Sequence, residues 1–279
     1  MMYKLTHFVS PFYIRFITAL LCVLTFTSFT ERNLAKAQHV YLPSNAFQHG
    51  EMIRYTVFYN VIGMYVNAGT AVLTTKKAKY NNVMAYHVVA EGTTNSKYDW
   101  IYKVRDRYES YFDAEDLKSL KFMRDINEGD FKHREEIVFN RKNNTASTED
   151  KTYKIPAKTM DVINAMFYAR NIDYNAYRAG DKISFSMFLD NKVYNMYIRY
   201  LGKERIKTRY GTFNAIKLRP LLLKGSIFEG GENMSLWVSD DANHIPLRVE
   251  SKIAVGSVKV DMMEYANIKH PLTSLISKR

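Results

Sequence analysis

Short runs of β-forming residues, separated by turn residues, fill most of the chain, and this pattern restricts the possible folds more than any other feature. The chain has 21 Tyr and 16 Phe among its 279 residues, and aromatic side chains fit the pleated, half-buried surface of a sheet. Along 83–93 both alternating sets of side chains are largely apolar, which is typical of a strand in a layered or strongly curved sheet. The expected strands cover residues 53–61, 66–75, 83–93, 100–112, 131–140, 182–189, 193–201, 205–210, 212–218, 233–238, 246–255 and 257–266.

The turns between these runs predict that neighbouring strands are antiparallel. Asp190 and Asn191 separate two runs as in a tight hairpin, and Gly256 separates the last two, where glycine can take the positive φ of a turn. No repeat of fixed period is visible, and no alternation of strands with helices supports a parallel, dinucleotide-binding type of sheet. We therefore expect an all-β, mainly antiparallel fold with a curved sheet that is a half-barrel or barrel-like.

One segment has the spacing of a helix instead. Within 156–172, Val162, Ala165, Met166 and Ala169 recur at helical intervals. Thr159 or Asp161 could cap the free N–H groups at the start. We expect one principal helix near 159–172, packed on or into a curved sheet, with a β-rich half on either side sharing one barrel-like core.

The N-terminal residues predict export. Lys4 and Arg15 supply positive charge, an apolar run covers 16–29, and the segment ends with Ala35-Lys36-Ala37, which is the order of a secretory signal peptide. The run is shorter than the roughly 20 residues that a membrane-spanning helix needs, so cleavage after Ala37 is favoured over a retained anchor. We expect a periplasmic protein of a Gram-negative envelope, with a signal peptide over 1–37 and no transmembrane span in the mature chain.

Cleavage would leave a single β-rich domain without cysteine. The mature chain would begin at Gln38 and contain 242 residues, 38–279, which is a common length for one all-β domain. Cys22 is the only cysteine of the chain, so the mature protein would have no disulfide. Leu21 stands where a lipoprotein signal needs a small residue, so we expect no lipid on Cys22.

The charge of the chain indicates an anionic partner or a well-solvated surface. The net charge is +12, of which the first 37 residues carry +3, so the mature part carries +9. In an exported protein this excess favours anionic envelope components or membrane surfaces over nucleic acid. The alternative is a surface that its charge keeps soluble.

Two groups of residues could bind a ligand. Lys203, Arg205, Lys207 and Arg209 follow one another at intervals of two, so an extended strand would place all four on one face. Such a row could receive phosphate or carboxylate groups, or it could be the water-facing side of a sheet. Trp100 and Tyr102 belong to an aromatic-rich segment that could line a cavity or form cross-strand pairs.

Catalytic and metal-binding motifs are weak. Asp240, Asp241 and His244 form the densest polar cluster and could act as acid and base, although Asp and Asn also form turns between strands. The histidines lack metal-ligand spacing, and the sequence contains neither a G-x-S-x-G motif nor a phosphate-binding loop. We therefore expect no metal and no cofactor.

Several short motifs, in their order along the chain, resemble one known family. They are Phe47-Gln48-His49-Gly50-Glu51 with Tyr55, then Gly63, Ala68-Gly69, Gly211-Thr212-Phe213, Lys217-Leu218-Arg219-Pro220, Leu236-Trp237-Val238-Ser239-Asp240-Asp241, Ile245-Pro246-Leu247-Arg248-Val249 and Val255-Gly256-Ser257. Over 47–268 the chain is similar to the domain-of-unknown-function family 3108 (DUF3108). The resemblance implies an exported bacterial protein with an all-β curved sheet like that of a group-4 capsule operon lipoprotein, and it supplies no catalytic residues.

Three functional hypotheses follow. The leading one is a non-enzymatic binding or carrier module, which holds an amphipathic or anionic envelope component (a lipid, lipopolysaccharide or acidic glycan) on the concave side of the sheet. The second is an envelope hydrolase or glycan-modifying enzyme that uses Asp240, Asp241 and His244. The third is a structural module that binds an envelope protein partner, and the oligomeric state is open in all three.

Overall fold

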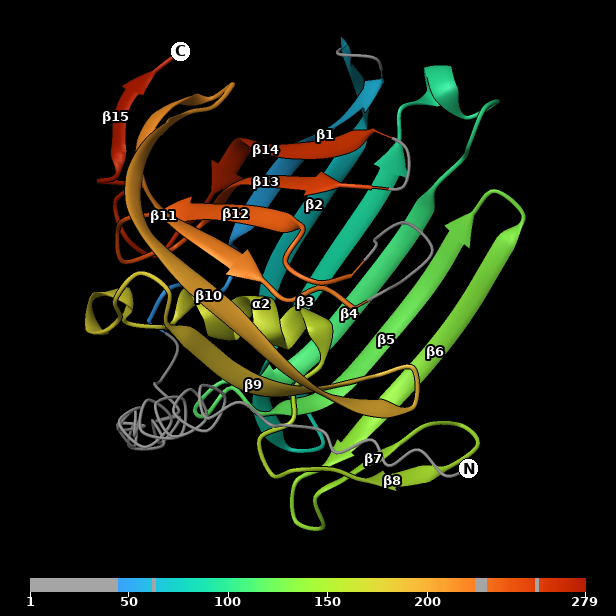
Figure 1. Cartoon of the computed structure of the whole chain (residues 1–279). Coiled ribbons are helices and arrows are strands. Elements are labelled where there is room, and N and C mark those ends of the chain that lie inside the picture. Colours follow the sequence, from blue (N-terminus) through green and yellow to red (C-terminus); the bar gives the residue numbers. More distant parts are fainter. Residues whose placement is uncertain (1–44, 62–63, 224–229, 254–255) are drawn as a thin grey trace, which may run out of the picture. The chain divides into compact units, whose positions relative to one another are not determined.

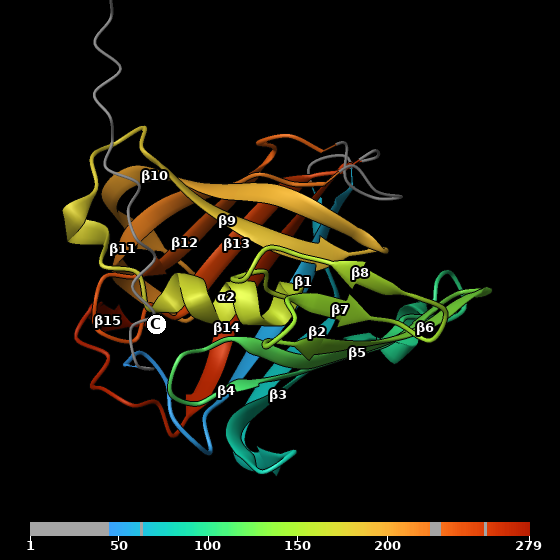
Figure 2. The same cartoon turned by 90° about the horizontal axis from the view of Figure 1, so that it is seen from below.

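One antiparallel sheet contains every named strand of the described residues, and it curves around a single α-helix, α2 (Val162–Arg170) (Figures 1 and 2). The computed structural model describes residues 45–61, 64–223, 230–253 and 256–279. All of them belong to one compact unit, Leu42–Arg279. The predicted signal peptide, the cleavage site after Ala37 and the question of a lipid on Cys22 lie outside the described residues.

The sheet has 15 strands in the described part of the chain. From one edge to the other they are β8 (Thr152–Lys154), β7 (Thr145–Ser147), β6 (Phe131–Asn140), β5 (Ser119–Glu128), β4 (Arg105–Asp113), β3 (Val83–Thr94), β2 (Met64–Tyr80), β1 (Met52–Val61), β14 (Ser257–Ala266), β13 (Pro246–Lys252), β12 (Met234–Ser239), β11 (Gly211–Pro220), β10 (Lys192–Lys207) and β9 (Lys182–Leu189), and β15 (Leu275–Lys278) pairs with β11.

The two β-rich halves meet along one seam. β1 pairs with β14, with Tyr55 opposite Met262, so strands before and after the helix share one sheet. The sheet does not close on itself, since β8 and β9 lie at its two edges. Part of the β9 edge is covered by Met160, whose N–H donates to the Ser186 carbonyl and whose carbonyl accepts from the Phe188 N–H, both at 2.9 Å.

The predicted fold class is confirmed, and the turns form as expected. Asp190 and Asn191 have φ of 48° and 62°, the two positive values of a type I′ hairpin turn. Gly256 has φ of 83°, and a Cβ there would lie 2.2 Å from the Asn60 carbonyl oxygen, so no other residue fits this turn without strain. The predicted bounds of β9 and β14 agree with the structure.

The expected strand at 100–112 is wrong at its start. β4 begins only at Arg105, because Asn95 caps a short 3₁₀ helix, η1 (Ser96–Tyr98), with a side-chain acceptor for the Lys97 N–H. Trp100 therefore lies in a turn. The two runs 193–201 and 205–210 also differ from expectation. All of the first and half of the second belong to the single strand β10, which has a register shift beside Gly202.

The start of helix α2 is fixed to the sheet by one buried carboxylate. Asp161 caps the helix, accepting from the Asn164 N–H at 2.9 Å through Oδ1. Its other oxygen, Oδ2, accepts from the hydroxyls of Ser110 on β4 and Ser119 on β5 at 2.8 and 2.7 Å. Thr159, the other predicted cap, donates to the Pro156 carbonyl instead. Burial raises the pKa of Asp161 to about 6, although the hydrogen bonds to its charged form oppose that rise.

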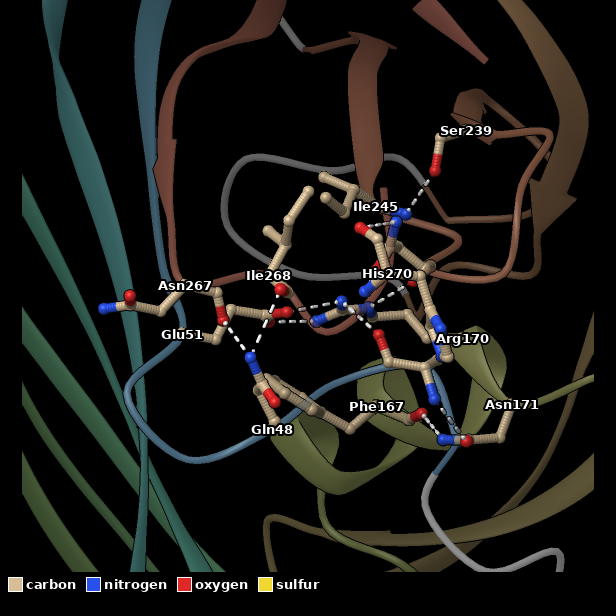
Figure 3. Close-up of polar contacts among 12 residues, drawn as sticks. Gln48, Glu51, Phe167, Arg170, Asn171, Ser239, Ile245, Asn267, Ile268 and His270 are labelled. Atoms are coloured by element: carbon tan, nitrogen blue, oxygen red, sulfur yellow. Dashed lines mark hydrogen bonds and ion pairs between the residues drawn. The ribbon is translucent and has the colours of Figure 1, made fainter. Parts of the chain in front are cut away.

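The end of the helix is held by a buried ion pair (Figure 3). The Arg170 guanidinium binds both carboxylate oxygens of Glu51, at 2.5 and 3.0 Å, and donates to the carbonyls of Asn243 and Ala46 at 3.0 Å each. The two charged side chains are only 3% and 1% exposed. The same guanidinium lies 5.3 Å from the centre of the Phe167 ring. Arg170 thus joins the helix to the segment before β1, which contains Ala46 and Glu51, and to the turn between β12 and β13.

We expect Asp161 to make stability depend on pH in an unusual direction. The folded protein keeps a proton on Asp161 up to about pH 6, whereas the unfolded chain loses it near the ordinary value of 3.8. The stabilisation relative to Asp161→Asn should therefore be complete below pH 4 and fall by about 3 kcal/mol as pH rises past 6. Urea unfolding of both proteins across this range measures the difference. Ser110→Ala, which removes a bond to the charged form, should move the fall to higher pH, and parallel profiles for wild type and Asp161→Asn would refute the assignment.

We expect the buried ion pair to be essential for stability. Arg170→Met should lower the free energy of unfolding by about 3–5 kcal/mol, because it leaves the Glu51 charge buried without a partner. The control is Arg54→Met, which breaks the exposed pair between Arg54 on β1 and Glu264 on β14 and should cost about 0–1 kcal/mol. Equal losses in urea titrations of the two variants would contradict the role assigned to Arg170.

Candidate functional site

The connection from β10 to β11 folds back against the middle of the sheet. The Thr208 N–H donates to the Gly211 carbonyl at 2.8 Å, and the Thr208 hydroxyl accepts from the Tyr210 N–H at 3.2 Å, which fixes a tight turn. From this turn the Arg209 N–H reaches Asp261 Oδ2 on β14 at 3.4 Å. β14 is separated from β10 by three strands in the sheet, so the strong bend of β10 (Figure 1) brings these segments together.

A hollow lined mainly by cationic and aromatic residues lies at this junction, and we name it the basic hollow. Its volume is about 210 Å³. It is lined by Phe58, Tyr65, Lys207, Thr208, Arg209, Arg248, Lys259, Asp261 and Arg279. Lys207, Arg209, Arg248 and Lys259 supply four positive charges against the one carboxylate of the lining, Asp261, and Lys259 also pairs at 2.9 Å with Glu250 beside the hollow.

One buried carboxylate organises this lining. Asp261 accepts from Arg248 through both oxygens, at 2.6 and 2.8 Å, and from the Arg209 backbone as described. The Arg209 guanidinium lies 4.1 Å from the centre of the Phe58 ring, and the Lys259 ammonium lies 4.5 Å from that of Tyr65. Arg209, Arg248 and Lys259 are thus positioned before any ligand arrives, which lowers the entropic cost of binding.

The basic hollow lies on the face of the sheet opposite helix α2. Ser110, which binds the helix cap, shares its face with Thr75 through the register of β2, β3 and β4. Thr70, an odd number of residues before Thr75 on β2, faces the other way, together with its cross-strand partners Thr56 and Asp261. The basic hollow thus lies on the outer face, whereas the leading hypothesis from the sequence gives the concave side to a ligand.

The predicted basic row divides between two hollows. Arg205, Lys207 and Arg209 are exposed and alternate with buried Ile206 and Thr208, as expected for one face of an extended segment. These three side chains form no ion pair with any carboxylate of the described residues. Lys203, the fourth member, differs.

Lys203 is already neutralised. Its ammonium pairs with Asp240 at 2.8 Å and donates to Asn175 Oδ1 at 2.9 Å. It lines a second hollow of about 460 Å³, together with Glu204, Arg205, Asn214, Ala215 and Asp240. Since opposite charges balance there, this second hollow offers less attraction to an anion.

The two predicted aromatic residues lie elsewhere. Trp100 is 82% exposed and Tyr102 is 49% exposed, in the connection between β3 and β4. The Tyr102 hydroxyl donates to Glu128 at 3.4 Å. Neither residue lines the basic hollow, where Phe58 and Tyr65 supply the aromatic surface.

The polar cluster at 239–244 forms a turn. Asp241 Oδ1 accepts from the Ser239 hydroxyl at 3.0 Å and from the Asn243 N–H at 3.0 Å. Asp240 pairs with Lys203. His244 Nδ1 lies 2.7 Å from the Arg170 carbonyl, and burial lowers the pKa of the imidazole. The three candidate catalytic side chains are therefore engaged with three different partners.

Sequence reasoning missed most of the basic hollow. It identified Lys207, at the end of β10, and Arg209, in the turn that follows, but not Phe58, Arg248 or Asp261. These come from three other strands, and only the bend of β10 brings them beside Arg209. No local pattern in the sequence reports that bend.

No group of three or more His, Cys, Asp or Glu side chains among the described residues is arranged to hold a metal ion. No helix among the same residues is long and apolar enough to cross a membrane.

Comparisons with known proteins agree with this architecture. A β-barrel-like protein of the domain-of-unknown-function family DUF1849 from Brucella abortus has a TM-score of 0.52 at 10% identity, over 81% of this chain and 100% of that one. A candidate lipoprotein from Parabacteroides distasonis (TM-score 0.35, 15% identity, 81% and 98% coverage) also matches. So does a candidate exported protein with a YmcC-like fold from Bacteroides fragilis (TM-score 0.34, 12% identity, 79% and 99% coverage). The Brucella structure supports the fold alone.

No curated protein matches the sequence. A family model described as "Protein of unknown function (DUF3108)" does match, over residues 54–263. The resemblance expected from the short motifs is thereby confirmed, and the chain belongs to the DUF3108 family.

Proposed function

We propose that this protein is a non-enzymatic binding or carrier module that holds the anionic head of an amphipathic envelope component in the basic hollow. The observation that carries the proposal is the set of side chains there: Lys207 and Arg209 have no carboxylate partner among the described residues, and they stand beside Phe58 and Tyr65. Unpaired cations that are held in place form a site for an anion.

The kind of anion follows from the donors. Arg209 offers a planar guanidinium that suits the paired oxygens of a phosphate or carboxylate, and Lys207 offers a point charge. Arg248 already donates to both carboxylate oxygens of Asp261. It therefore adds to the positive electrostatic potential of the hollow more than to direct contacts with a ligand. A phosphate or carboxylate head could be bound by Arg209 and Lys207 together.

The size of the hollow favours a head group over a whole ligand. Its volume of about 210 Å³ is below the roughly 300–1,000 Å³ typical of pockets that enclose a complete small molecule. The remainder of a ligand would therefore lie outside the hollow, where the exposed part of Tyr65 at its edge offers apolar contact. A molecule with a charged head and an apolar portion uses both surfaces, as a lipid, lipopolysaccharide or acidic glycolipid would.

The envelope as the place of action rests on the predicted signal peptide at 1–37 and on the resemblance to a family of exported proteins. In that compartment the abundant anionic amphiphiles are lipids and glycolipids. The site needs no metal, nucleotide or redox group for this role.

We expect decyl phosphate, a soluble amphiphile with one anionic head, to bind in isothermal titration calorimetry. Lys207→Ser and Arg209→Ser should each weaken binding by about tenfold, since a hydrogen bond to a charged group contributes roughly 1.5–3 kcal/mol. Decyl glucoside, which has the same tail and a neutral head, should bind far more weakly. Raising the salt concentration should weaken binding without abolishing it, because apolar burial is not screened.

Lys192→Ser is the matched control, because Lys192 is exposed at the opposite end of β10. It should leave binding unchanged. Equal binding of decyl phosphate and decyl glucoside, or an equal effect of Lys192→Ser and Lys207→Ser, would refute the proposal. Native mass spectrometry of protein purified gently from its own envelope should also show a bound anionic amphiphile.

A further inference from the structure

Large apolar side chains gather at one end of the sheet, and we name this group the apolar rim. It consists of Met64, Tyr65, Trp100, Ile101, Tyr102 and Phe131, each of which is between 44% and 82% exposed. They lie in or beside every second connection of this part of the sheet, namely those between β1 and β2, β3 and β4, and β5 and β6. In an antiparallel sheet such alternate connections lie at the same end. At the opposite end of these strands, the described residue of this kind is Met84, at 46%.

The rim is held in place by the backbone and by an ion pair. The Asn95 N–H donates to the Ala68 carbonyl at 2.8 Å, and the Gly129 N–H donates to the Lys103 carbonyl at 2.8 Å. The connection between β3 and β4 is thus fastened to both of its neighbours. Within it, Asp99 accepts from Arg105 at 2.6 Å and from the Thr94 hydroxyl at 2.7 Å. The exposed side chains are therefore presented by an ordered loop.

The composition of the rim fits the surface of a bilayer. Trp and Tyr prefer the boundary between water and hydrocarbon because each joins a polar group to an apolar ring. Lys97, Lys103 and Lys132 flank the rim, against the carboxylates of Asp130 and of Glu128, which accepts from the Tyr102 hydroxyl. Lysines near a membrane surface are attracted by anionic lipids. The side chains project from the tips of strand connections, where shallow insertion of several tips is geometrically simple.

The rim is also continuous with the basic hollow. Tyr65 belongs to the rim and lines the hollow as well, with the Lys259 ammonium over its ring. A bilayer that contacts the rim would therefore lie beside the cations of the hollow. Head groups at the bilayer surface and the hollow would then be at the same level.

We propose that the apolar rim docks this protein onto the surface of an anionic lipid bilayer, with Trp100, Ile101 and Phe131 inserted at the level of the head groups. Docking of this kind goes beyond the binding of one ligand and does not require that the hollow be occupied. It would hold the protein at the surface of the membrane.

The test uses vesicles of phosphatidylcholine with phosphatidylglycerol and follows the fluorescence of Trp100. The chain has two tryptophans, and Trp237 is buried, so Trp237→Phe isolates the Trp100 signal. We expect a blue shift of emission on mixing, and quenching by lipids brominated near the head group. In co-flotation, Ile101→Ser and Phe131→Ser should each weaken vesicle binding by about tenfold, the scale of one buried apolar side chain.

Met84→Ser is the matched control and should leave vesicle binding unchanged, because Met84 lies at the other end of the same strands. An unshifted Trp100 emission, or equal losses for Met84→Ser and Ile101→Ser, would overturn the inference. So would a dimer mass in light scattering that Trp100→Ser returns to a monomer, since the rim would then be a contact between two copies. Binding of decyl phosphate reports on the hollow separately, so failure of one proposal is distinguishable from failure of the other.

Discussion

The ion pair between Arg170 and Glu51 is the interaction on which the architecture depends. Because the sheet is open at both edges, its curvature is not fixed by closure into a barrel. Here a helix packs against its concave side. Arg170 fixes the end of that helix to the segment leading into β1 and to the turn after β12, while Asp161 fixes its start to β4 and β5. The Arg170 anchor is an ion pair removed from water, so it stabilises the fold only while its partners stay in position. The helix is therefore fixed at both ends to the sheet that curves around it.

The outer face uses the same principle with a different outcome. Asp261 is as buried as Glu51, and it too organises an arginine, Arg248, by a two-oxygen contact. At the helix the cation is enclosed and fully used, whereas around Asp261 the neighbouring cations Lys207 and Arg209 remain open to solvent. Membership of the DUF3108 family describes the fold without assigning chemistry to either place. Within the described part of the chain, the cluster around Glu51 has no cation left for a ligand and is structural, whereas the cluster around Asp261 has cations without a carboxylate partner and is a candidate binding site.

Much of the fold could be predicted from the sequence, because strand and turn signals are local. Asp190-Asn191 and Gly256 form the turns that their residue types require, and Val162–Arg170 is the helix expected from its spacing. Trp100 was misplaced because an Asn95 cap and a short 3₁₀ helix outweighed the strand preference of aromatic residues. β5 was missed because its charged residues, such as Lys121 and Arg124, obscure the alternation. Of the basic hollow, only Lys207 and Arg209 could be predicted. Arg209 reaches Phe58 and Asp261 through a bend of β10 that no local pattern encodes.

The seam between β1 and β14 has a consequence for how the chain reaches this structure. Arg54 on β1 contacts Glu264 on β14, which is 210 positions away in the sequence. Glu51 pairs with Arg170, which is 119 positions away. During synthesis β1 can pair with β2 at once, but its other edge stays open until residues 257–266 have emerged. Contacts between such distant residues slow folding, and an open strand edge invites pairing with other chains. Pairing of β14 with β1 therefore comes late in folding. Because β14 lies in the middle of the sheet, its removal would expose a new strand edge there and would not merely shorten one side of the sheet.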